Sequence, residues 1–329
     1  MRAPRAFVMA FEPKRVSTTP ADVFHIQWPE TIFEGRGGKI LPVAAWKARC
    51  VLATASKIKK LGGKVVLTIH NAAPHANLSA GQKLLWTWYF GALLDQTDHL
   101  IGLSASSIQT FLAANPRAHG IATTEIQHPH YRTVYQSVPQ TGARAATSLP
   151  AQGRLIGILG TIRPSKRVPE AITIFRQLRS DDSLLIWGEA DDLVWAQVVA
   201  AATGSDRVIL RRGTMSDDEL STAISAVDVV LINQAATLNS GTALLALSLG
   251  RRVIAPAVGS LVWLRQLAGS AWVRLFDPPL TAIALRLAIQ DLPAPEGIGP
   301  DLSTLDPAHV SGQLLALFEA LKSPPLQAR

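Results

Sequence analysis

Short β-branched runs alternate with amphipathic stretches along this sequence, and the alternation comes in two series. The pattern is typical of βαβ units with parallel sheets, and it predicts an α/β protein. A polar stretch with proline and glycine, residues 140–153, separates the two series. The length of 329 residues agrees with two domains at about 100–200 residues each. We therefore predict two doubly wound, Rossmann-like domains that face a cleft.

The apolar runs define the expected elements. In the first series we expect strands at 6–10, 23–27, 64–69 and 99–103, with helices at 41–61 and 79–96. In the second series we expect strands at 155–159, 183–187, 208–211, 229–232 and 252–255, with helices at 169–179, 193–203, 217–226 and 241–249. A last helix is expected at 307–321. The domains are expected at 1–148 and 149–310, and a C-terminal helix and tail at 311–329 would return to the first domain.

The composition excludes several classes of protein. Hydrophobic residues make up 48% and charged residues 17% of the chain, which is unlike a disordered chain. Cys50 is the single cysteine, so a disulfide framework and a cysteine-based zinc site are excluded, and a reducing compartment is favoured. No apolar run approaches the length of about 18 residues that a spanning helix needs. The sequence thus predicts a cytoplasmic protein.

The net charge of +8 is unevenly distributed. Up to residue 150 there are 16 basic and 7 acidic residues, whereas the remainder holds 16 basic and 17 acidic residues. An excess confined to the first half indicates an anionic partner there, which could be a membrane face, a phosphorylated substrate or nucleic acid. A basic surface that only keeps the protein in solution is the alternative.

Polar residues follow the expected strands of the first half. Glu30, after Pro29, emerges where a strand ends and could act as a general base, although a salt-bridged surface glutamate is the alternative. His70, Asn71 and His75 follow the next strand and offer hydrogen bonds suited to sugar hydroxyls or phosphate. Their spacing, without a nearby carboxylate or thiolate, argues against zinc. The loop HPHY, residues 128–131, is either a third polar site or a structural loop.

Two clusters in the second half predict a phosphate site. Gly160 directly follows an apolar strand, and Arg163 and Lys166 add two cations over one short turn, which suits a diphosphate better than a solvated loop. The segment 237–242 opens a helix, whose free N–H groups form an anion site without a metal. The G-x-x-x-x-G-K-[ST], G-x-G-x-x-G and G-x-S-x-G motifs are all missing from the sequence, which weakens ATPase, NAD-dependent and hydrolase interpretations.

A basic helix and an aromatic block in the first half could contact a membrane. The expected helix 41–61 carries five basic residues, and the block WTWYF occupies residues 86–90. A basic amphipathic helix beside aromatic side chains can lie in a membrane interface. Aromatic stripes are also common in protein cores, so both interpretations stay open.

The stretches HIQWPE, TIHNAAPH, HPHY, GTIRPSKRV and LNSGTALLALSLGRRVIAP occur in this order from about residue 23 to residue 256. Together they resemble the GT-B glycosyltransferases, and most closely the inverting β-mannosyltransferases of bacterial exopolysaccharide assembly, the GumI-like family. The resemblance implies transfer of mannose from GDP-mannose to a polyprenyl-diphosphate-linked oligosaccharide at the inner face of the cytoplasmic membrane. It implies neither a cofactor nor an essential metal, and no nucleic-acid partner. An anionic membrane surface is the further partner that it implies.

The same resemblance implies roles for individual residues. The first domain would bind the acceptor and the second the nucleotide sugar, with the base and ribose bordered by 186–189 and 211–214. Glu30 is the preferred catalytic base because of its position at a strand end, and not because of the resemblance, and His75 is the reserve. The implied donor-binding residues are His70, Asn71, Gly160, Arg163, Lys166, Gly188, Asn239, Ser240, Gly241 and Thr242. The implied acceptor-binding residues are His25, Trp28, His130 and Tyr131.

Three alternatives stay open at this point. The donor could be a UDP-sugar, such as UDP-glucose or UDP-glucuronate. The chain could instead be a non-catalytic basic protein that binds nucleic acid or an anionic membrane. An enzyme of different chemistry on a similar framework, such as a UDP-sugar epimerase, would need no acceptor.

Overall fold

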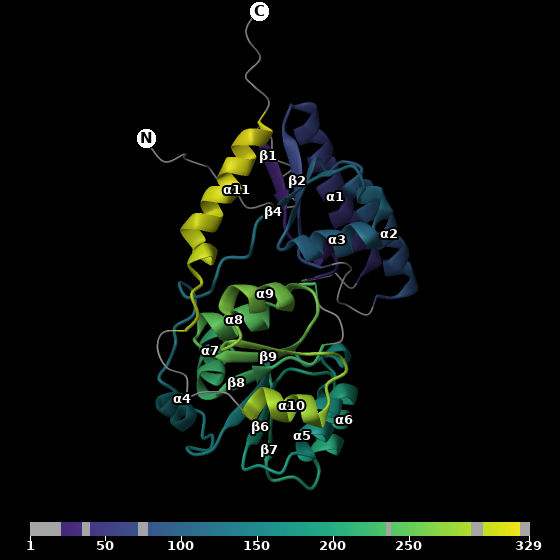
Figure 1. Ribbon diagram of the computed structural model, residues 1–329. Coiled ribbons are helices and arrows are strands. Elements are labelled where there is room, and N and C mark those ends of the chain that lie inside the picture. The colour runs from purple at the N-terminus through teal and green to yellow at the C-terminus, as the bar shows by residue number, and fades with distance from the viewer. Residues whose placement is uncertain (1–20, 35–39, 72–77, 235–237, 291–298, 323–329) are drawn as a thin grey trace, which may run out of the picture. The chain divides into compact units, whose positions relative to one another are not determined.

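The computed structural model describes residues 21–34, 40–71, 78–234, 238–290 and 299–322. The chain forms two compact units, one from residues 1–128 with 307–329 and the other from residues 129–306 (Figure 1). Both units are built from parallel strands and helices in alternation. The prediction of an α/β protein with two parallel sheets is therefore confirmed. The expected strand at residues 6–10 lies outside the described residues.

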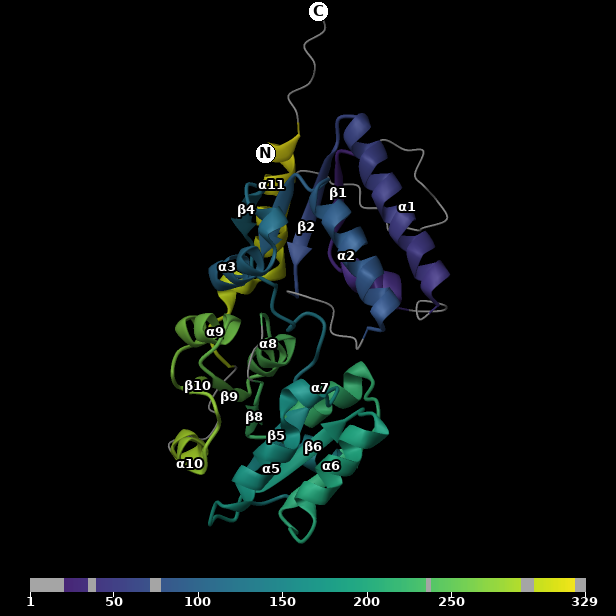
Figure 2. The same ribbon diagram turned by 90° about the vertical axis from the view of Figure 1, so that its right-hand side faces the viewer.

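The first unit contains a four-stranded parallel sheet in the order β1-β2-β3-β4. The strands are β1 (Val23–Ile26), β2 (Lys64–Ile69), β3 (His99–Gly102) and β4 (Ala122–Glu125), and the connecting helices are α1 (Leu41–Lys60), α2 (Ala80–Leu94) and α3 (Ala105–Ala114). A short 3-10 turn, Pro29–Phe33, follows β1. Because each connection advances the sheet in the same direction, right-handed crossovers place α1, α2 and α3 on one face. Figure 2 shows α1 and α2 side by side in front of the sheet.

The last helix, α11 (Pro307–Leu321), packs on the sheet of the first unit. Val310 joins a buried cluster with Val66, Ile101 and Ile126. Near the other end of α11, Phe318 makes an edge-to-face contact with His25 at 5.3 Å between ring centroids. The sheet is thereby covered by α11 as well as by α1, α2 and α3, which removes its apolar side chains from water (Figure 1).

The second unit contains a six-stranded parallel sheet in the order β10-β9-β8-β5-β6-β7. Its strands are β5 (Leu155–Leu159), β6 (Ser183–Gly188), β7 (Val208–Arg212), β8 (Val229–Leu231), β9 (Arg252–Pro256) and β10 (Val273–Phe276). Its helices are α4 (Gln140–Ala146), α5 (Val168–Arg176), α6 (Asp192–Ala202), α7 (Asp217–Ala226), α8 (Gly241–Ser248), α9 (Ser260–Ala268) and α10 (Ala282–Gln290). The strand order reverses at β5, which lies between β6 and β8. A reversal of this kind opens a crevice at the carboxyl ends of the two diverging strands.

The segment 140–153, expected from its composition to separate two domains, begins with helix α4 of the second unit. Arg144 of this helix is buried and forms an ion pair with Asp228 at 2.7 Å. It also donates to the carbonyl oxygens of Ala226 and Gly153, each at 3.0 Å. These bonds compensate the burial of the charge and tie the segment to the sheet. Sequence analysis also missed α3, β4, α9, β10 and α10.

In the part of the chain that the structure describes, no helix combines the length and the apolarity that crossing a membrane would require.

Two glycines at neighbouring strand ends allow the backbones to pass closely. A Cβ atom added to Gly188, at the end of β6, would overlap the carbonyl oxygen of Gly160, directly after β5. We expect Gly188→Ala to lower the free energy of unfolding by about 1–3 kcal/mol because backbone atoms must move apart. Urea unfolding of the purified protein measures this change.

Gly142→Ala on α4 is the matched control, because an added Cβ atom meets nothing within 4 Å there. Alanine has the higher helix propensity, so this variant should gain up to about 1 kcal/mol. Equal unfolding midpoints for Gly188→Ala and the unaltered protein would contradict the close approach.

Candidate active site

A pocket in the second unit lies where the strand order of its sheet reverses, between β5 and β8. The carboxyl ends of β5 and β8 contribute Leu159 and the residues 231–234, and Lys166, Ser240 and Thr242 complete the lining. Two of the sequence-predicted phosphate clusters, the turn after β5 and the start of α8, therefore lie beside one pocket. Ligands of open parallel sheets bind at such a reversal.

The turn after β5 folds back over the end of its own strand. Gly160 has a φ of +82°, a conformation that costs glycine little and other residues much more. Its N–H donates to the carbonyl oxygen of Trp187 at 3.0 Å, and the N–H of Ile162 donates to that of Glu189 at 2.7 Å. These bonds hold the turn against β6, with the 3-10 segment Pro164–Lys166 projecting beyond it.

Lys166 is held inside the pocket by a hydrogen bond to the end of β5. Its Nζ donates to the carbonyl oxygen of Leu159 at 3.0 Å. Burial, and to a lesser degree the charge of Arg163, lower the pKa of Lys166 to about 8. Arg163 itself is exposed. One buried ammonium and one exposed guanidinium thus provide positive charge beside the same pocket, which suits a diphosphate.

Helix α8 begins at the opposite wall of this pocket. Ser240 caps it by accepting a hydrogen bond from the N–H of Ala243 at 3.3 Å. The first-turn N–H groups and the helix dipole favour an anion at this end. A Cβ atom at Gly241 would lie 3.5 Å from the hydroxyl of Tyr131. Tyr131, grouped with the acceptor residues by sequence, therefore lies in the second unit next to the predicted donor residues Asn239, Ser240, Gly241 and Thr242.

His130 has a structural environment in the same unit. Its backbone N–H donates to the carbonyl oxygen of Leu305 at 2.9 Å, and its side chain is buried. The contacts of this histidine are thus with the second unit.

Asn233 was missed by sequence analysis. It follows β8 and lines the pocket, and its amide nitrogen donates to the carbonyl oxygen of Arg167 at 3.1 Å. Arg167 has a φ of +49°. The bond therefore fixes an unusual backbone conformation at the end of residues 160–167, the basic turn that contains Arg163 and Lys166. The sequence signal that could have identified Asn233 was its position directly after the expected strand 229–232.

The ends of β6 and β7 border the basic turn on its other side. The guanidinium of Arg211 lies 4.7 Å from the ring centroid of Trp187. Thr214 donates from its hydroxyl to Glu189 at 3.2 Å. The segments 186–189 and 211–214, expected to border a nucleoside, thus contact each other.

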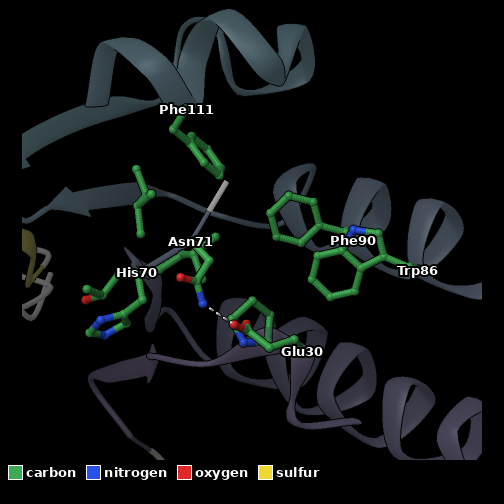
Figure 3. A pocket seen from close by; sticks show the side chains of 10 residues that line it. Glu30, His70, Asn71, Trp86, Phe90 and Phe111 are labelled. Carbon is green, nitrogen blue, oxygen red and sulfur yellow. Dashed lines mark hydrogen bonds between the residues drawn. The ribbon is translucent and has the colours of Figure 1, made fainter. Parts of the chain in front are cut away.

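A second pocket lies in the first unit, at the carboxyl ends of its strands. Figure 3 shows Glu30 and Asn71 pointing toward each other beside the rings of Trp86, Phe90 and Phe111. The Asn71 amide nitrogen donates to Glu30 Oε1 at 2.7 Å. The indole of Trp86 stacks on the ring of Phe90 at 4.6 Å between centroids. The hydrogen bond from Asn71 therefore fixes the orientation of the Glu30 carboxylate in this pocket.

Tyr89 is a further group near Glu30 that sequence analysis missed. Its side chain is fully buried, and within the described residues its hydroxyl has no hydrogen-bond partner. Burial and then the charge of Glu30 raise the pKa of Tyr89. The phenol therefore stays protonated and adds no negative charge to this pocket.

Two histidines of the first unit are neutral near pH 7. Burial lowers the pKa of His25 and of His70 to about 4, and His128 and His25 add to the effect at His70. His25 is hydrogen-bonded to Thr68 at 2.7 Å and His70 to Gln27 at 2.8 Å. Trp28 stacks on His70 at 3.9 Å between centroids. His75 lies outside the described residues.

The predicted residues thus form two groups, one in each unit. Glu30, Asn71, His70, His25 and Trp28 lie around the first pocket and its neighbouring strands. The second group comprises Gly160, Arg163, Lys166, Gly188 and the start of α8. In the described part of the chain, no three histidine, cysteine, aspartate or glutamate side chains are placed to hold a metal ion.

Solved structures of similar fold include a glycosyltransferase from Rickettsia africae and sugar-phosphate synthases. Sucrose-phosphate synthase from Thermosynechococcus elongatus matches with a TM-score of 0.67 and 18% identity over 91% of this chain and 73% of that one. HepE from Anabaena, solved with UDP and glucose, matches with a TM-score of 0.65 and 15% identity over 88% of this chain and 84% of that one. These similarities show that the chain has the GT-B fold.

The sequence identifies a family within that class. No protein-family model matches the chain. The GDP-mannose:glycolipid 4-β-D-mannosyltransferase of Xanthomonas campestris pv. campestris is 31% identical over 297 residues, which is 89% of this chain and 78% of that protein. The chain belongs to the family of this enzyme and is itself a glycosyltransferase. The resemblance drawn from the sequence motifs is thereby confirmed.

The lowered pKa of Lys166 predicts a pH dependence for anion binding. With a pKa of about 8, the side chain is protonated below that pH and loses its charge as the pH rises above it. The affinity for GDP should therefore fall between pH 7 and pH 9.5, and isothermal titration calorimetry at several pH values measures it.

Lys166→Arg is the control for this titration, because its guanidinium keeps its charge over the whole range. Binding of GDP to that variant should depend far less on pH. A pH profile that is the same for both proteins would rule out Lys166 as the titrating group.

Proposed function

We propose that the protein is an inverting mannosyltransferase. It moves mannose from GDP-mannose to a polyprenyl-diphosphate-linked oligosaccharide in exopolysaccharide synthesis, at the inner face of the cytoplasmic membrane. The second unit binds the donor and the first unit binds the acceptor. The observation that carries the proposal is the pocket of the second unit, where Lys166 and the start of α8 lie at the carboxyl ends of β5 and β8.

The donor assignment is supported by the chemistry of that pocket. The leaving GDP gains negative charge on its β-phosphate as the bond to the sugar breaks. Lys166, Arg163 and the N–H groups at the start of α8 stabilise this charge where it develops, which lowers the barrier. Because these cations and N–H groups are already in position, they need no rearrangement during the reaction. GDP-mannose is preferred among nucleotide sugars because the Xanthomonas relative is named for it.

The catalytic base in this proposal is Glu30. An acceptor hydroxyl attacks the anomeric carbon from the face opposite GDP, and its proton passes to the Glu30 carboxylate as the new bond forms. Displacement in a single step inverts the anomeric configuration. The hydrogen bond from Asn71 orients the carboxylate, and neutral His25 and His70 do not compete for the proton near pH 7 because their pKa values lie at about 4.

The acceptor assignment is supported by the relative's name, which describes its acceptor as a glycolipid. Around the first pocket, the exposed Trp28 and the partly exposed Trp86 offer flat apolar surfaces on which sugar rings can pack. His25 and Trp28 remain the proposed acceptor contacts. A lipid-linked acceptor requires the enzyme to work at a membrane surface.

Replacement of the proposed base tests the mechanism. Glu30→Gln keeps the size of the side chain and an oxygen that can accept from Asn71, but it cannot take the proton. We expect kcat to fall about 10²–10⁴-fold, while calorimetry gives an unchanged Kd for GDP-mannose. Glu34→Gln, at the end of the same 3-10 turn, is the matched control and should retain full activity. Normal turnover by Glu30→Gln would refute the assignment.

Removal of a diphosphate contact tests the donor site. Arg163→Ala should lower kcat/KM by about 10²–10³-fold, because one stabilising charge is lost in the transition state. Arg179→Ala, an exposed arginine of the same unit, should have no effect. Calorimetry with GDP-mannose, UDP-glucose and UDP-glucuronate identifies the donor, and NMR of the product gives its anomeric configuration. If Arg163→Ala and Lys166→Ala both turned over normally near KM, the donor site would lie elsewhere.

A further inference from the structure

The outward faces of α1 and α2 in the first unit carry large apolar side chains. Trp46 of α1 is 45% exposed, and Leu84 and Trp88 of α2 are 74% and 49% exposed. Ile40 and Leu41, where α1 begins, are also exposed. We call these five residues the apolar patch. Exposed apolar groups gathered in this way mark contact surfaces for other molecules.

Helices α1 and α2, which carry the apolar patch, begin side by side. A Cβ atom at Gly81 would lie 3.1 Å from Leu41 Cδ2, so the first turns of α1 and α2 are in contact. Both helices connect parallel strands and run in the same direction (Figure 2). With a rise of 1.5 Å per residue, Trp46 lies about 8 Å along α1 from Leu41, and Leu84 and Trp88 lie about 5 and 11 Å along α2 from Gly81.

The aromatic residues of α2 divide between two environments. Tyr89 and Phe90 are buried in the core, and Trp86 stacks on Phe90. Trp88 points away from this cluster and is half exposed. The aromatic block of the sequence thus serves as core and as surface at once. The side chains left outside are not required to fill the interior.

The two helices that carry the apolar patch have charged side chains of one sign. Helices α1 and α2 together contain six basic residues and no acidic residue. Arg49 and Lys60 of α1 and Lys83 of α2 are exposed on this side of the unit. Tryptophan and leucine next to arginine and lysine match the interface of a bilayer that contains anionic lipid, where indole rings lie at headgroup level.

We propose that the apolar patch and its basic neighbours Arg49 and Lys83 dock the protein on an anionic lipid bilayer. The inference rests on the proposed function in one respect, because a glycolipid acceptor requires the enzyme to approach a membrane. Each tryptophan inserts its ring between headgroups, and the cations pair with lipid phosphates. The docking needs no spanning helix.

Binding of the full-length protein to vesicles tests the docking surface. Co-sedimentation compares vesicles of phosphatidylcholine alone with vesicles that also contain phosphatidylglycerol. We expect binding to the anionic vesicles that weakens as salt is added. Trp46→Ser with Trp88→Ser should weaken this binding about tenfold or more. Arg49→Glu with Lys83→Glu should weaken it by a similar factor on anionic vesicles only.

The matched control lies on α10, where Arg286 and Leu287 are an exposed basic and apolar pair. Arg286→Glu with Leu287→Ser should leave vesicle binding unchanged. Thermal unfolding checks that each variant is folded, because all the altered side chains are exposed. Turnover of a water-dispersed acceptor with a short lipid should be the same in all variants.

The outcomes distinguish this inference from the proposed function. Absence of vesicle binding, or equal binding by the tryptophan pair and the unaltered protein, would overturn the docking surface even if mannose is transferred. Self-association that Trp46→Ser with Trp88→Ser abolishes, without vesicle binding, would assign the patch to a second copy of the chain. Patch-dependent vesicle binding without turnover of any nucleotide sugar would support the docking surface and refute the proposed function.

Discussion

The close passage of Gly160 and Gly188 is the constraint on which the second-unit pocket depends. No side chain fits between the two strand ends, and Gly160 takes up a positive φ to turn the chain back. The basic turn is therefore folded over β5, where Lys166 reaches the carbonyl oxygen of Leu159. A cation held by backbone geometry is already in place before an anion arrives, so little ordering is required on binding. The same geometry explains its low pKa, because the ammonium is removed from water.

Much of the fold could be predicted from sequence because several strands, such as β2, β3 and β5, are buried on both faces. The strand LIGIL, β5, and the helix 217–226, α7, were predicted with the bounds that the structure has. Elements with weaker patterns were missed. The polar strand ATTE, β4, lacks an apolar run, and α4 has the composition of a linker although Arg144 anchors it in the interior. Local composition does not reveal an ion pair formed with a residue 84 positions away.

The candidate sites could be located but not completed from sequence. Strand-end position was sufficient to select Glu30, Asn71 and Lys166, because the carboxyl ends of parallel strands meet at one edge. The partner of each side chain was not accessible in this way. The hydrogen bond from the Asn71 amide to the Glu30 carboxylate, for example, joins residues 41 positions apart. The contact between Tyr131 and Gly241 joins residues 110 positions apart in the chain, which no local pattern can report.

The course of the chain has a consequence for how the protein is synthesised. The first unit is assembled from residues 1–128 and 307–329, with the whole second unit between them. During vectorial translation, the second unit emerges completely before α11 leaves the ribosome. Until then Val66, Ile101 and Ile126 lack the helix that shields them. The nascent first unit therefore exposes one apolar sheet face for the time needed to translate the second unit, until α11 covers it.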